Sequence, residues 1–584
     1  MTFLKSVFST LVGLLIFSFV IGFFFFVTIA GLIAISSDEA PEITPNSVLT
    51  VNLSGFIHER VAEDPFKDLF PESADNKLAL LETIETIARA KTDDNIKGIY
   101  LRHGGISGGY SALHEIRAAL EDFKSSGKFI YSYAEYMPEA NYYVASVADE
   151  IYLNPAGGME FNGLSANVSF FKGLLDKLDI EAQIFRVGTY KSAVEPFFRK
   201  DLSEANREQM TSFINDIYDN YLLNVSETRG IALDKLRGIS DQMLAREPED
   251  ALKLGLITAV DYENGIKDKI REALGLEKDE DIQSINLQAY AKSNSPTYSS
   301  NKVAVIVAEG EIVSGKGDTE TVGSDKFVKA IRDARKSDRV KAVVIRINSP
   351  GGSALASDVM WNEIMLTKAV KPVIASMSTV AASGGYYMAM PCDTIVAQPM
   401  TITGSIGIFG MIPNMGGFLE NKLGITNDGV STGEFSNLYR VSSALNEGEK
   451  AIIQNMVESG YESFTSKAAQ GRNMSIEDLK AVASGRVWTG AQAKENGLVD
   501  VLGSYNDAVE LAANAANLDG DYMISYYPAL KTKWEELLGS MANEAEARIM
   551  KNKYGTMAEY VEKVKELESY KGIQARMPFE IEIK

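Results

Sequence analysis

Cysteine and histidine are scarce in this chain of 584 residues. It contains one cysteine, Cys392, and three histidines, His58, His103 and His114, all in the first half. A single cysteine excludes an intrachain disulfide. One cysteine and three histidines also cannot form any of the usual zinc-binding spacings. None of the histidines lies in a recognisable catalytic motif, so a Ser-His-Asp triad could form only across the two halves.

Positive charge is also in deficit. The chain has 58 lysines and arginines against 79 aspartates and glutamates, which gives a formal net charge of −21. This balance argues against nucleic acid or anionic lipid headgroups as the main partner of the folded body. The length suits two or more domains, because single hydrophobic cores rarely grow beyond about 250–300 residues.

Charge is absent altogether from Ser6 to Ser37, a segment dense in Phe, Leu, Val and Ile. About 20 apolar residues span a bilayer as a helix, whereas a cleavable signal peptide has an apolar core of roughly 7–15 residues. Lys5 precedes the segment and Asp38 follows it, which favours a cytoplasmic N-terminus and a body outside the cytoplasm. We therefore predict a cytoplasmic tip and transmembrane signal anchor over residues 1–37. A removed signal peptide is the alternative, and it would also export the body.

The rest of the chain repeats itself. Residues 97–102 (KGIYLR) resemble residues 341–346 (KAVVIR) at a separation of 244 (346 − 102). Residues 251–257 match residues 493–499 at a separation of 242 (497 − 255, glycine to glycine). A near-constant offset held over this distance indicates a tandem duplication.

Each copy has the pattern of an α/β fold, because short β-branched runs alternate with helical segments and this predicts a mainly parallel sheet. In the second copy we expect strands at 303–307, 342–347, 373–376 and 394–396, and helices at 324–336 and 354–367. Polar composition without apolar periodicity indicates a linker between the copies. The predicted domains after the anchor are a first copy at 38–290, a linker at 291–302, a second copy at 303–530 and a helical C-terminal extension at 531–584.

Two glycine-serine motifs in the second copy suggest acyl-transfer chemistry. Ser383 is followed by Gly384 at the predicted junction of a strand-rich segment and a helix, where its Oγ is exposed and backbone N–H groups can approach a carbonyl. Gly352 follows a predicted strand, at the sheet edge where α/β proteins place their sites. N–H groups of Gly352 and Gly384 could stabilise an oxyanion, a contribution of about 3–4 kcal/mol per donor in other enzymes. One Ser-Gly-Gly motif is commonly a turn, but two motifs separated by one β-α unit favour a site.

A serine hydroxyl needs a neighbouring base, and Lys191 is the candidate. Burial among its apolar neighbours would lower the lysine pKa from about 10.4 towards about 7–8. In the first copy the position that matches Ser383 is Glu139, and the second copy has no lysine where residues 433–436 align with the Lys191 segment. Because one copy keeps the base and the other keeps the nucleophile, we predict one composite site between them. The alternative is decay of one copy, with Lys191 an ordinary surface residue.

The chain resembles the signal peptide peptidase A (protease IV) family in its long, tandem form. The motifs that carry the resemblance occur in the family's order over nearly the whole chain: VGTYKSAVEPF from Val187 to Phe197, NSPGGS from Asn348 to Ser353, AASGGYY from Ala381 to Tyr387, TGSIGIFG from Thr403 to Gly410, and GRVWTG from Gly485 to Gly490. The resemblance implies an α/β fold that contains the ClpP/crotonase-like unit twice.

The same resemblance implies the roles of individual residues. Ser383 would be the nucleophile, Lys191 the general base and Ser405 the residue that orients the lysine, while Gly352 and Gly384 would supply oxyanion donors. It implies a membrane-anchored serine endopeptidase that degrades cleaved signal peptides and other apolar peptides at the outer, periplasmic face of the cytoplasmic (inner) membrane. A homo-oligomer, by resemblance a tetramer, and no metal or organic cofactor are expected.

Two other functions fit parts of the pattern. A crotonase-type enzyme acting on acyl-CoA would also use two glycine donors, but CoA chemistry belongs inside the cell and the predicted topology places the body outside. A non-catalytic membrane scaffold made of two degenerate copies would not need the serine or the lysine.

Overall fold

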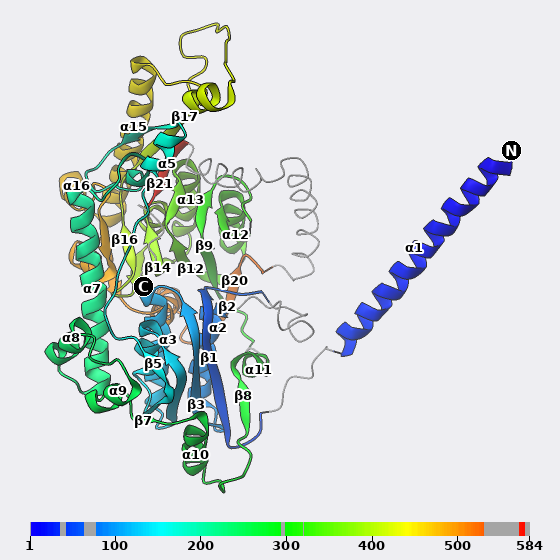
Figure 1. The fold of residues 1–584 in the computed structure, drawn as a ribbon, viewed down its shortest axis with the longest axis vertical. Helices are drawn as coiled ribbons and strands as arrows, with labels where there is room; N and C mark the ends of the chain where they lie inside the picture. The colour runs from blue at the N-terminus through cyan, green and yellow to red at the C-terminus, as the bar shows by residue number, and fades with distance from the viewer. Residues whose placement is uncertain are drawn as a thin grey trace.

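The computed structural model describes residues 2–35, 43–62, 77–293, 298–318, 320–530 and 572–577. The N-terminal helix α1 (Thr2–Ile35) is drawn apart from the body of the molecule in Figure 1. Its window Val7–Phe24 has a mean hydropathy of 2.4 and is not buried against the rest of the chain. By length and composition, α1 is therefore a candidate membrane span.

The first copy is built on a seven-stranded sheet in the order β2-β1-β3-β4-β5-β7, with β8 paired to β1. Every pairing in this sheet is parallel. The strands are β1 (Ser47–His58), β2 (Lys77–Ala79), β3 (Ile96–Ser107), β4 (Phe129–Met137), β5 (Glu150–Met159), β7 (Ala259–Val260) and β8 (Ser284–Asn286). The helices are α2 (Leu80–Thr92), α3 (Tyr110–Lys124), α4 (Glu139–Ala145), α5 (Lys172–Lys177), α6 (Glu195–Phe198), α7 (Glu204–Arg229), α8 (Leu233–Asp241), α9 (Pro248–Leu254), α10 (Glu263–Leu274) and α11 (Leu287–Lys292).

The second copy has an eight-stranded sheet: six strands lie in the order β18-β16-β14-β12-β9-β20, β15 pairs with β14, and β19 pairs with β15. Its pairings are parallel except for β16 with β18. The strands are β9 (Lys302–Glu309), β12 (Val340–Ser349), β14 (Val373–Ala382), β15 (Thr394–Ala397), β16 (Ile402–Gly404), β18 (Val487–Thr489), β19 (Val501–Leu502) and β20 (Met523–Tyr527). The helices are α12 (Ser324–Lys336), α13 (Ala354–Lys368), α14 (Gly384–Ala389), the π-helical turn η2 (Phe418–Lys422), α15 (Glu447–Arg472), α16 (Ile476–Val482), α17 (Gly490–Glu495) and α18 (Tyr505–Ala515).

The predicted α/β fold and its duplication are confirmed. Helices α2 and α12 begin 244 residues apart, and so do α3 and α13. The four predicted strands lie within β9, β12, β14 and β15, and the two predicted helices are α12 and, to within one residue, α13. The central strand β12 is buried on both faces, as parallel strands covered by helices are. Its β-branched residues Val343, Val344, Ile345 and Ile347 are interrupted only by Arg346.

A third sheet joins the two copies. Its six strands lie in the order β11-β10-β13-β21-β17-β6, and β6 comes from the first copy. The strands are β6 (Glu181–Arg186), β10 (Glu311–Val313), β11 (Thr321–Gly323), β13 (Gly351–Ser353), β17 (Phe409–Asn414) and β21 (Gly572–Arg576).

Strand β21 corrects the prediction of a helical C-terminal extension. Residues 572–576 are extended and lie between β13 and β17, far along the chain from both. The open edges of β13 and β17 offer backbone hydrogen-bond partners to this segment, and a helix could not use them. Pairing with distant strands therefore overrides the helical preference of the local sequence. The remainder of the predicted extension at 531–584, apart from Met577, lies outside the described residues.

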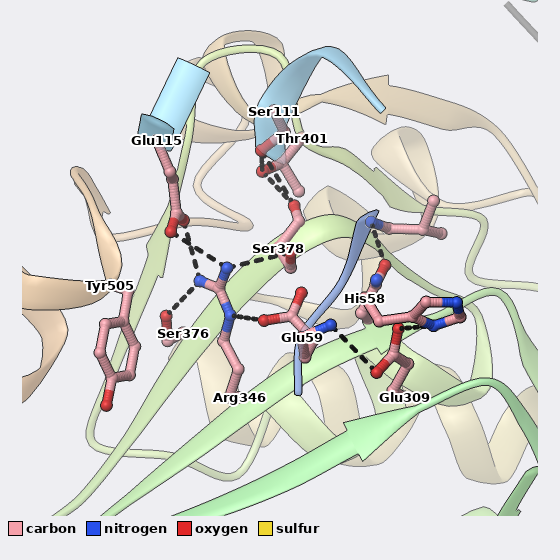
Figure 2. Close-up of polar contacts among 12 residues, drawn as sticks. His58, Glu59, Ser111, Glu115, Glu309, Arg346, Ser376, Ser378, Thr401 and Tyr505 are labelled. Carbon is pink, nitrogen blue, oxygen red and sulfur yellow. Dashed lines mark hydrogen bonds and ion pairs between the residues drawn. The ribbon is translucent and has the colours of Figure 1, made fainter. Parts of the chain in front are cut away.

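A buried cluster of charges also holds the copies together, and Figure 2 shows it around Arg346 of β12. The guanidinium donates to Glu59 at 2.7 Å and to both carboxylate oxygens of Glu115 at 2.9 and 3.1 Å. The hydroxyl oxygens of Ser376 and Ser378 accept its other hydrogen bonds at 3.0 Å. Both carboxylates belong to the first copy and the arginine to the second, so the cluster fixes how the copies meet.

Arg346→Leu should lower the free energy of unfolding by about 3–5 kcal/mol, because Glu59 and Glu115 would stay buried without the positive charge that compensates them. Urea denaturation of the purified protein measures this loss. Arg102, at the equivalent position of the first copy, is a matched control, since its ion pair with Glu263 (3.3 Å) leaves the arginine side chain 52% exposed. Arg102→Leu should cost less than about 1 kcal/mol. Equal losses from the two changes would contradict the assignment.

Candidate active site

Ser383 lies at the turn between β14 and α14 and is held in a strained backbone conformation. Its φ is +54° and its ψ −110°, a region that non-glycine residues rarely adopt. Its N–H donates to the Gly404 carbonyl at 2.9 Å, and that bond ties the turn to β16. The fold thus holds Ser383 in an unfavourable backbone conformation at the carboxyl end of β14.

Lys191 reaches this serine from the first copy. Its Nζ lies 2.9 Å from the Oγ of Ser383, 2.9 Å from the carbonyl oxygen of Ser405 and 3.0 Å from the Oγ of Ser405. All three residues are 0% exposed. The structure therefore brings together the predicted nucleophile, base and orienting residue, from both copies, within one chain.

Burial lowers the pKa of the Lys191 ammonium well below its ordinary value of 10.5. The cause is the loss of hydration, which disfavours the charged form of a side chain in a dry site. The lysine at this position is therefore poised to be a neutral amine at a pH where surface lysines are charged.

Two glycines that sequence reasoning did not select shape the lysine pocket. A Cβ on Gly485, whose φ is +80°, would lie 2.6 Å from the backbone nitrogen of Lys191, and one on Gly407 would lie 3.1 Å from its Cδ. Both belong to motifs that carry the family resemblance. The motifs therefore contained both glycines, but only the fold shows that the absence of a side chain at these positions leaves space for Lys191.

A polar network fixes the turn that carries the lysine. The Nε2 of Gln209 donates to the Ser192 Oγ at 2.8 Å and to the Tyr190 carbonyl at 3.1 Å. Its Oε1 accepts from the N–H of Val487 in β18 at 3.1 Å, and the Ser192 Oγ donates to Asn206 at 2.9 Å. Because α7 supplies Asn206 and Gln209 and the second copy supplies β18, the network holds the base against the domain that carries the nucleophile.

The predicted oxyanion residues are close-packed glycines beside this serine. Gly384 is the residue after Ser383, and a Cβ on Gly351 would lie 2.6 Å from the Gly384 nitrogen. Gly352 pairs with Ile312 on one side, where a Cβ would lie 2.1 Å from the Ile312 carbonyl oxygen. Sequence reasoning named Gly351 only as part of its motif, and the structure shows that a side chain at this position would crowd the Gly384 nitrogen.

Comparison with known families decides the assignment. The model of Peptidase family S49 matches residues 122–277 and again residues 365–519. The chain belongs to peptidase family S49. The two matched segments begin 243 residues apart (365 − 122), in agreement with the offset of the sequence repeat.

Relatives of this S49 chain carry protease names. Protease 4 of Haemophilus influenzae is 37% identical over 84% of this chain and 83% of its own length. Protease 4 of Salmonella typhi is 35% identical, over 90% and 88%. The chloroplastic serine protease SPPA of Arabidopsis thaliana is 36% identical, over 82% and 70%.

The predicted family is thereby confirmed, and the protein is a serine protease. Neither the acyl-CoA enzyme nor the non-catalytic scaffold agrees with this membership. Among solved structures, a ClpP1 mutant from Listeria monocytogenes covers 35% of this S49 chain at a TM-score of 0.24 and 15% identity, a likeness too weak to carry an argument.

The histidines of this S49 protease are engaged elsewhere. His58 lies 3.2 Å from Glu309, His103 lies 2.8 Å from Ser132, and the Nδ1 of His114 lies 2.7 Å from the hydroxyl of Tyr143. Burial lowers the pKa of His103 to about 3 and that of His114 to about 4. A Ser-His-Asp triad across the halves is therefore not formed at Ser383.

The equivalent position of the first copy is not a nucleophile. Glu139 begins α4 and accepts hydrogen bonds from the N–H groups of Asn162 (3.1 Å) and Gly163 (3.0 Å). Burial raises the pKa of this carboxyl to about 7. The position that holds the serine in one copy thus holds, in the other, a carboxyl that accepts hydrogen bonds from the backbone of a loop. In the described part of the chain, no group of three or more His, Cys, Asp or Glu side chains could hold a metal ion.

Proposed function

We propose that this S49 serine protease is a membrane-anchored endopeptidase with a Ser383–Lys191 dyad, which degrades cleaved signal peptides and other apolar peptides on the extracytoplasmic face of the cytoplasmic (inner) membrane. The observation that carries the proposal is the 2.9 Å contact between the Lys191 Nζ and the Ser383 Oγ in a site with no exposed surface. Ser405 orients the lysine, and Gly352 and Gly384 donate to the oxyanion.

The hydrogen-bonding capacity of a neutral lysine matches its three contacts. An uncharged amine has two N–H donors and one lone pair. The two donors suit the carbonyl oxygen and the Oγ of Ser405, which leaves the lone pair directed at the Ser383 hydroxyl. Lys191 is thereby oriented to accept the serine proton, as a general base must.

The reaction follows from this arrangement. The Ser383 Oγ bonds to the scissile carbonyl carbon while its proton passes to the Lys191 Nζ, and the N–H groups of Gly352 and Gly384 stabilise the oxyanion. The C–N bond then breaks, and the Lys191 ammonium gives its proton to the leaving amine. A water molecule bonds to the acyl carbon, gives one proton to Lys191, and Ser383 recovers a proton as the acid product leaves.

The substrate class rests on the anchor and on a named relative. Helix α1 is long and apolar enough to hold the protease at a bilayer, with Lys5 on the cytoplasmic side by the positive-inside rule. A relative from Enterococcus faecium, 33% identical over 39% of this chain and 67% of its own length, is named a putative signal peptide peptidase SppA. Signal peptides left in a membrane are apolar peptides within reach of such an anchor. Assembly into a homo-oligomer, a tetramer, is part of the proposal.

The full chain reconstituted in lipid vesicles tests this function. We expect it to fragment a synthetic signal peptide embedded in the same vesicles and to leave intact the same sequence still joined to a folded passenger domain. Mass spectrometry of the products locates the cuts, and the Ser383→Ala chain is the control that should produce none. Cleavage of the joined protein at the signal junction, or fragments with Ser383→Ala, would contradict the proposal.

A further inference from the structure

The turn at residues 483–486, between α16 and β18, holds the loop that carries Lys191. The Tyr190 N–H donates to the Ser484 carbonyl at 3.1 Å, and the Thr189 N–H donates to the Ser484 Oγ at 3.2 Å. Ser484 has a φ of +58°, a left-handed conformation that is uncommon for a residue with a side chain. The loop belongs to the first copy and the turn to the second, so these bonds bring the base to the domain of the nucleophile.

The same turn also fixes Ser405, whose two oxygens contact the lysine. The Ser405 N–H donates to the Arg486 carbonyl at 2.7 Å, and the Gly485 N–H donates to the Ile406 carbonyl at 2.8 Å. The φ of Ser405 is +48°, so this residue too is held in a left-handed conformation. One short turn thus binds both the loop of the base and the residue that orients the base.

The side chain of Arg486 adds a second contact with the lysine loop. Its guanidinium carbon lies 4.7 Å from the centre of the Tyr190 ring and 4.4 Å from the centre of the Trp488 ring. One of its nitrogens donates to the Tyr190 hydroxyl at 3.2 Å and lies 3.0 Å from a carboxylate oxygen of Glu208. The Tyr190 hydroxyl itself donates to Glu208 at 3.1 Å. The arginine side chain is only 21% exposed, and desolvation strengthens contacts between a cation and an aromatic ring.

We propose that Arg486 is a positioning residue of the protease: its carbonyl fixes Ser405, and its side chain fixes the loop that carries Lys191. The proposal rests on the Ser383–Lys191 dyad proposed above and adds a residue that acts through the base. A planar guanidinium stacks on aromatic rings while it pairs with a carboxylate, which an apolar chain cannot do. The contact therefore keeps Tyr190, and with it the adjacent lysine, in one conformation.

Loss of this contact should change both the geometry and the hydration of the base. A misplacement of about 1 Å in a reacting group can cost about 100-fold in rate. The pKa of Lys191 is lowered because the amine is buried, so a loop that moves and admits water should let this pKa rise towards its ordinary value. A residue that only stabilised the fold would change neither kcat nor the lysine pKa of the folded protein.

Steady-state kinetics across pH, with a fluorogenic apolar peptide and the full chain, tests the role of Arg486. We expect Arg486→Met to lower kcat about 10- to 100-fold and to leave KM nearly unchanged, because the contact positions the base and does not bind substrate. The pH below which kcat/KM falls should rise by about one unit. Arg89→Met is the matched control and should change neither quantity, because the Arg89 guanidinium also lies over a tyrosine ring, that of Tyr290 at 4.2 Å, but on α2 and α11 of the first copy. An Arg486→Met chain with the kcat and the pH profile of the unaltered protein would overturn the proposal.

A double-mutant cycle shows whether Arg486 acts through Tyr190. Tyr190→Leu removes the ring that the guanidinium contacts, and it should reproduce the kcat loss of Arg486→Met. The double variant should lose little more than either single variant, because both changes break one contact. Losses that multiply would show that the arginine acts independently of the lysine loop, which would overturn the proposal.

The pH dependence of folding stability measures the same effect without hydrolysis. Lys191 becomes neutral in the folded chain at a pH where the unfolded chain is still protonated, so its contribution to stability begins to rise at its folded-state pKa. Urea denaturation of the unaltered chain and of Arg486→Met, each compared with its own Lys191→Met derivative, isolates this contribution. We expect the rise to begin about one pH unit higher in the Arg486→Met chain, and a rise at the same pH in both would overturn the proposal. If no chain hydrolyses any peptide but the rise is displaced, the proposed function fails and the positioning role stands.

Discussion

Lys191→Met should lower kcat for peptide hydrolysis by about 10⁴-fold or more while the protein remains folded, because no other base contacts Ser383 in its described surroundings. Ser383→Ala should cause a similar loss, and the double variant little more, since residues that act as a unit are not additive. Steady-state kinetics with a fluorogenic apolar peptide, together with thermal unfolding, measures both effects. Lys200→Met is the matched control at an exposed lysine and should leave kcat unchanged.

The same variants show whether the site is formed within one chain. Nζ and Oγ are 2.9 Å apart in a single chain, so an equal mixture of Lys191→Met and Ser383→Ala should recover no activity. Recovery on mixing would assign the two groups to neighbouring chains. A Lys191→Met protein that keeps its kcat would show that another base serves Ser383.

The pH profile should follow the lysine. Only the neutral amine can accept the proton, and burial holds the Lys191 pKa well below 10.5, so kcat/KM should fall as pH drops through that lowered pKa and level off above it. The unfolded chain binds a proton at Lys191 up to pH of about 10.4, so folding stability should also rise with pH between the two pKa values. Lys191→Met should remove that part of the stability slope.

Gly351→Ala should lower kcat by about 10²–10³-fold, the loss typical of one oxyanion donor. The added Cβ would lie 2.1 Å from the carbonyl oxygen of Ala575 and 2.6 Å from the nitrogen of Gly384, so it would crowd the proposed oxyanion donor. Steady-state kinetics measures the change, and KM should shift less than kcat because the oxyanion develops in the transition state.

Gly315→Ala separates this effect from backbone strain. Gly315 has a φ of +83°, close to the +97° of Gly351, but a Cβ there would meet nothing within 4 Å. Both substitutions carry the cost of a left-handed residue, about 1–2 kcal/mol, and only the one at Gly351 crowds the proposed donor. A similar loss of kcat in both variants would show that Gly351 acts through folding alone.

Much of this site was predictable from local sequence. Ser383 and Gly384 occur together in one motif, and the missing lysine of the second copy indicated that Lys191 acts across the duplication. Their catalytic roles stay predictions, although the structure brings the side chains into contact. Gly485 was harder to identify, because it acts by leaving space for Lys191. The need for that space arises only in the folded protein and leaves no pattern in the neighbouring sequence.

The sequence by itself determined the duplication, the α/β class, the apolar helix and the protease family, because each depends on short-range periodicity or on motifs of a few residues. Only the tertiary structure decided that Lys191 is stripped of water, that Arg346 joins the copies, and that residues 572–576 form a strand beside Gly352. Burial and strand pairing are set by groups hundreds of residues away. A segment with no strong preference of its own takes its conformation from those partners.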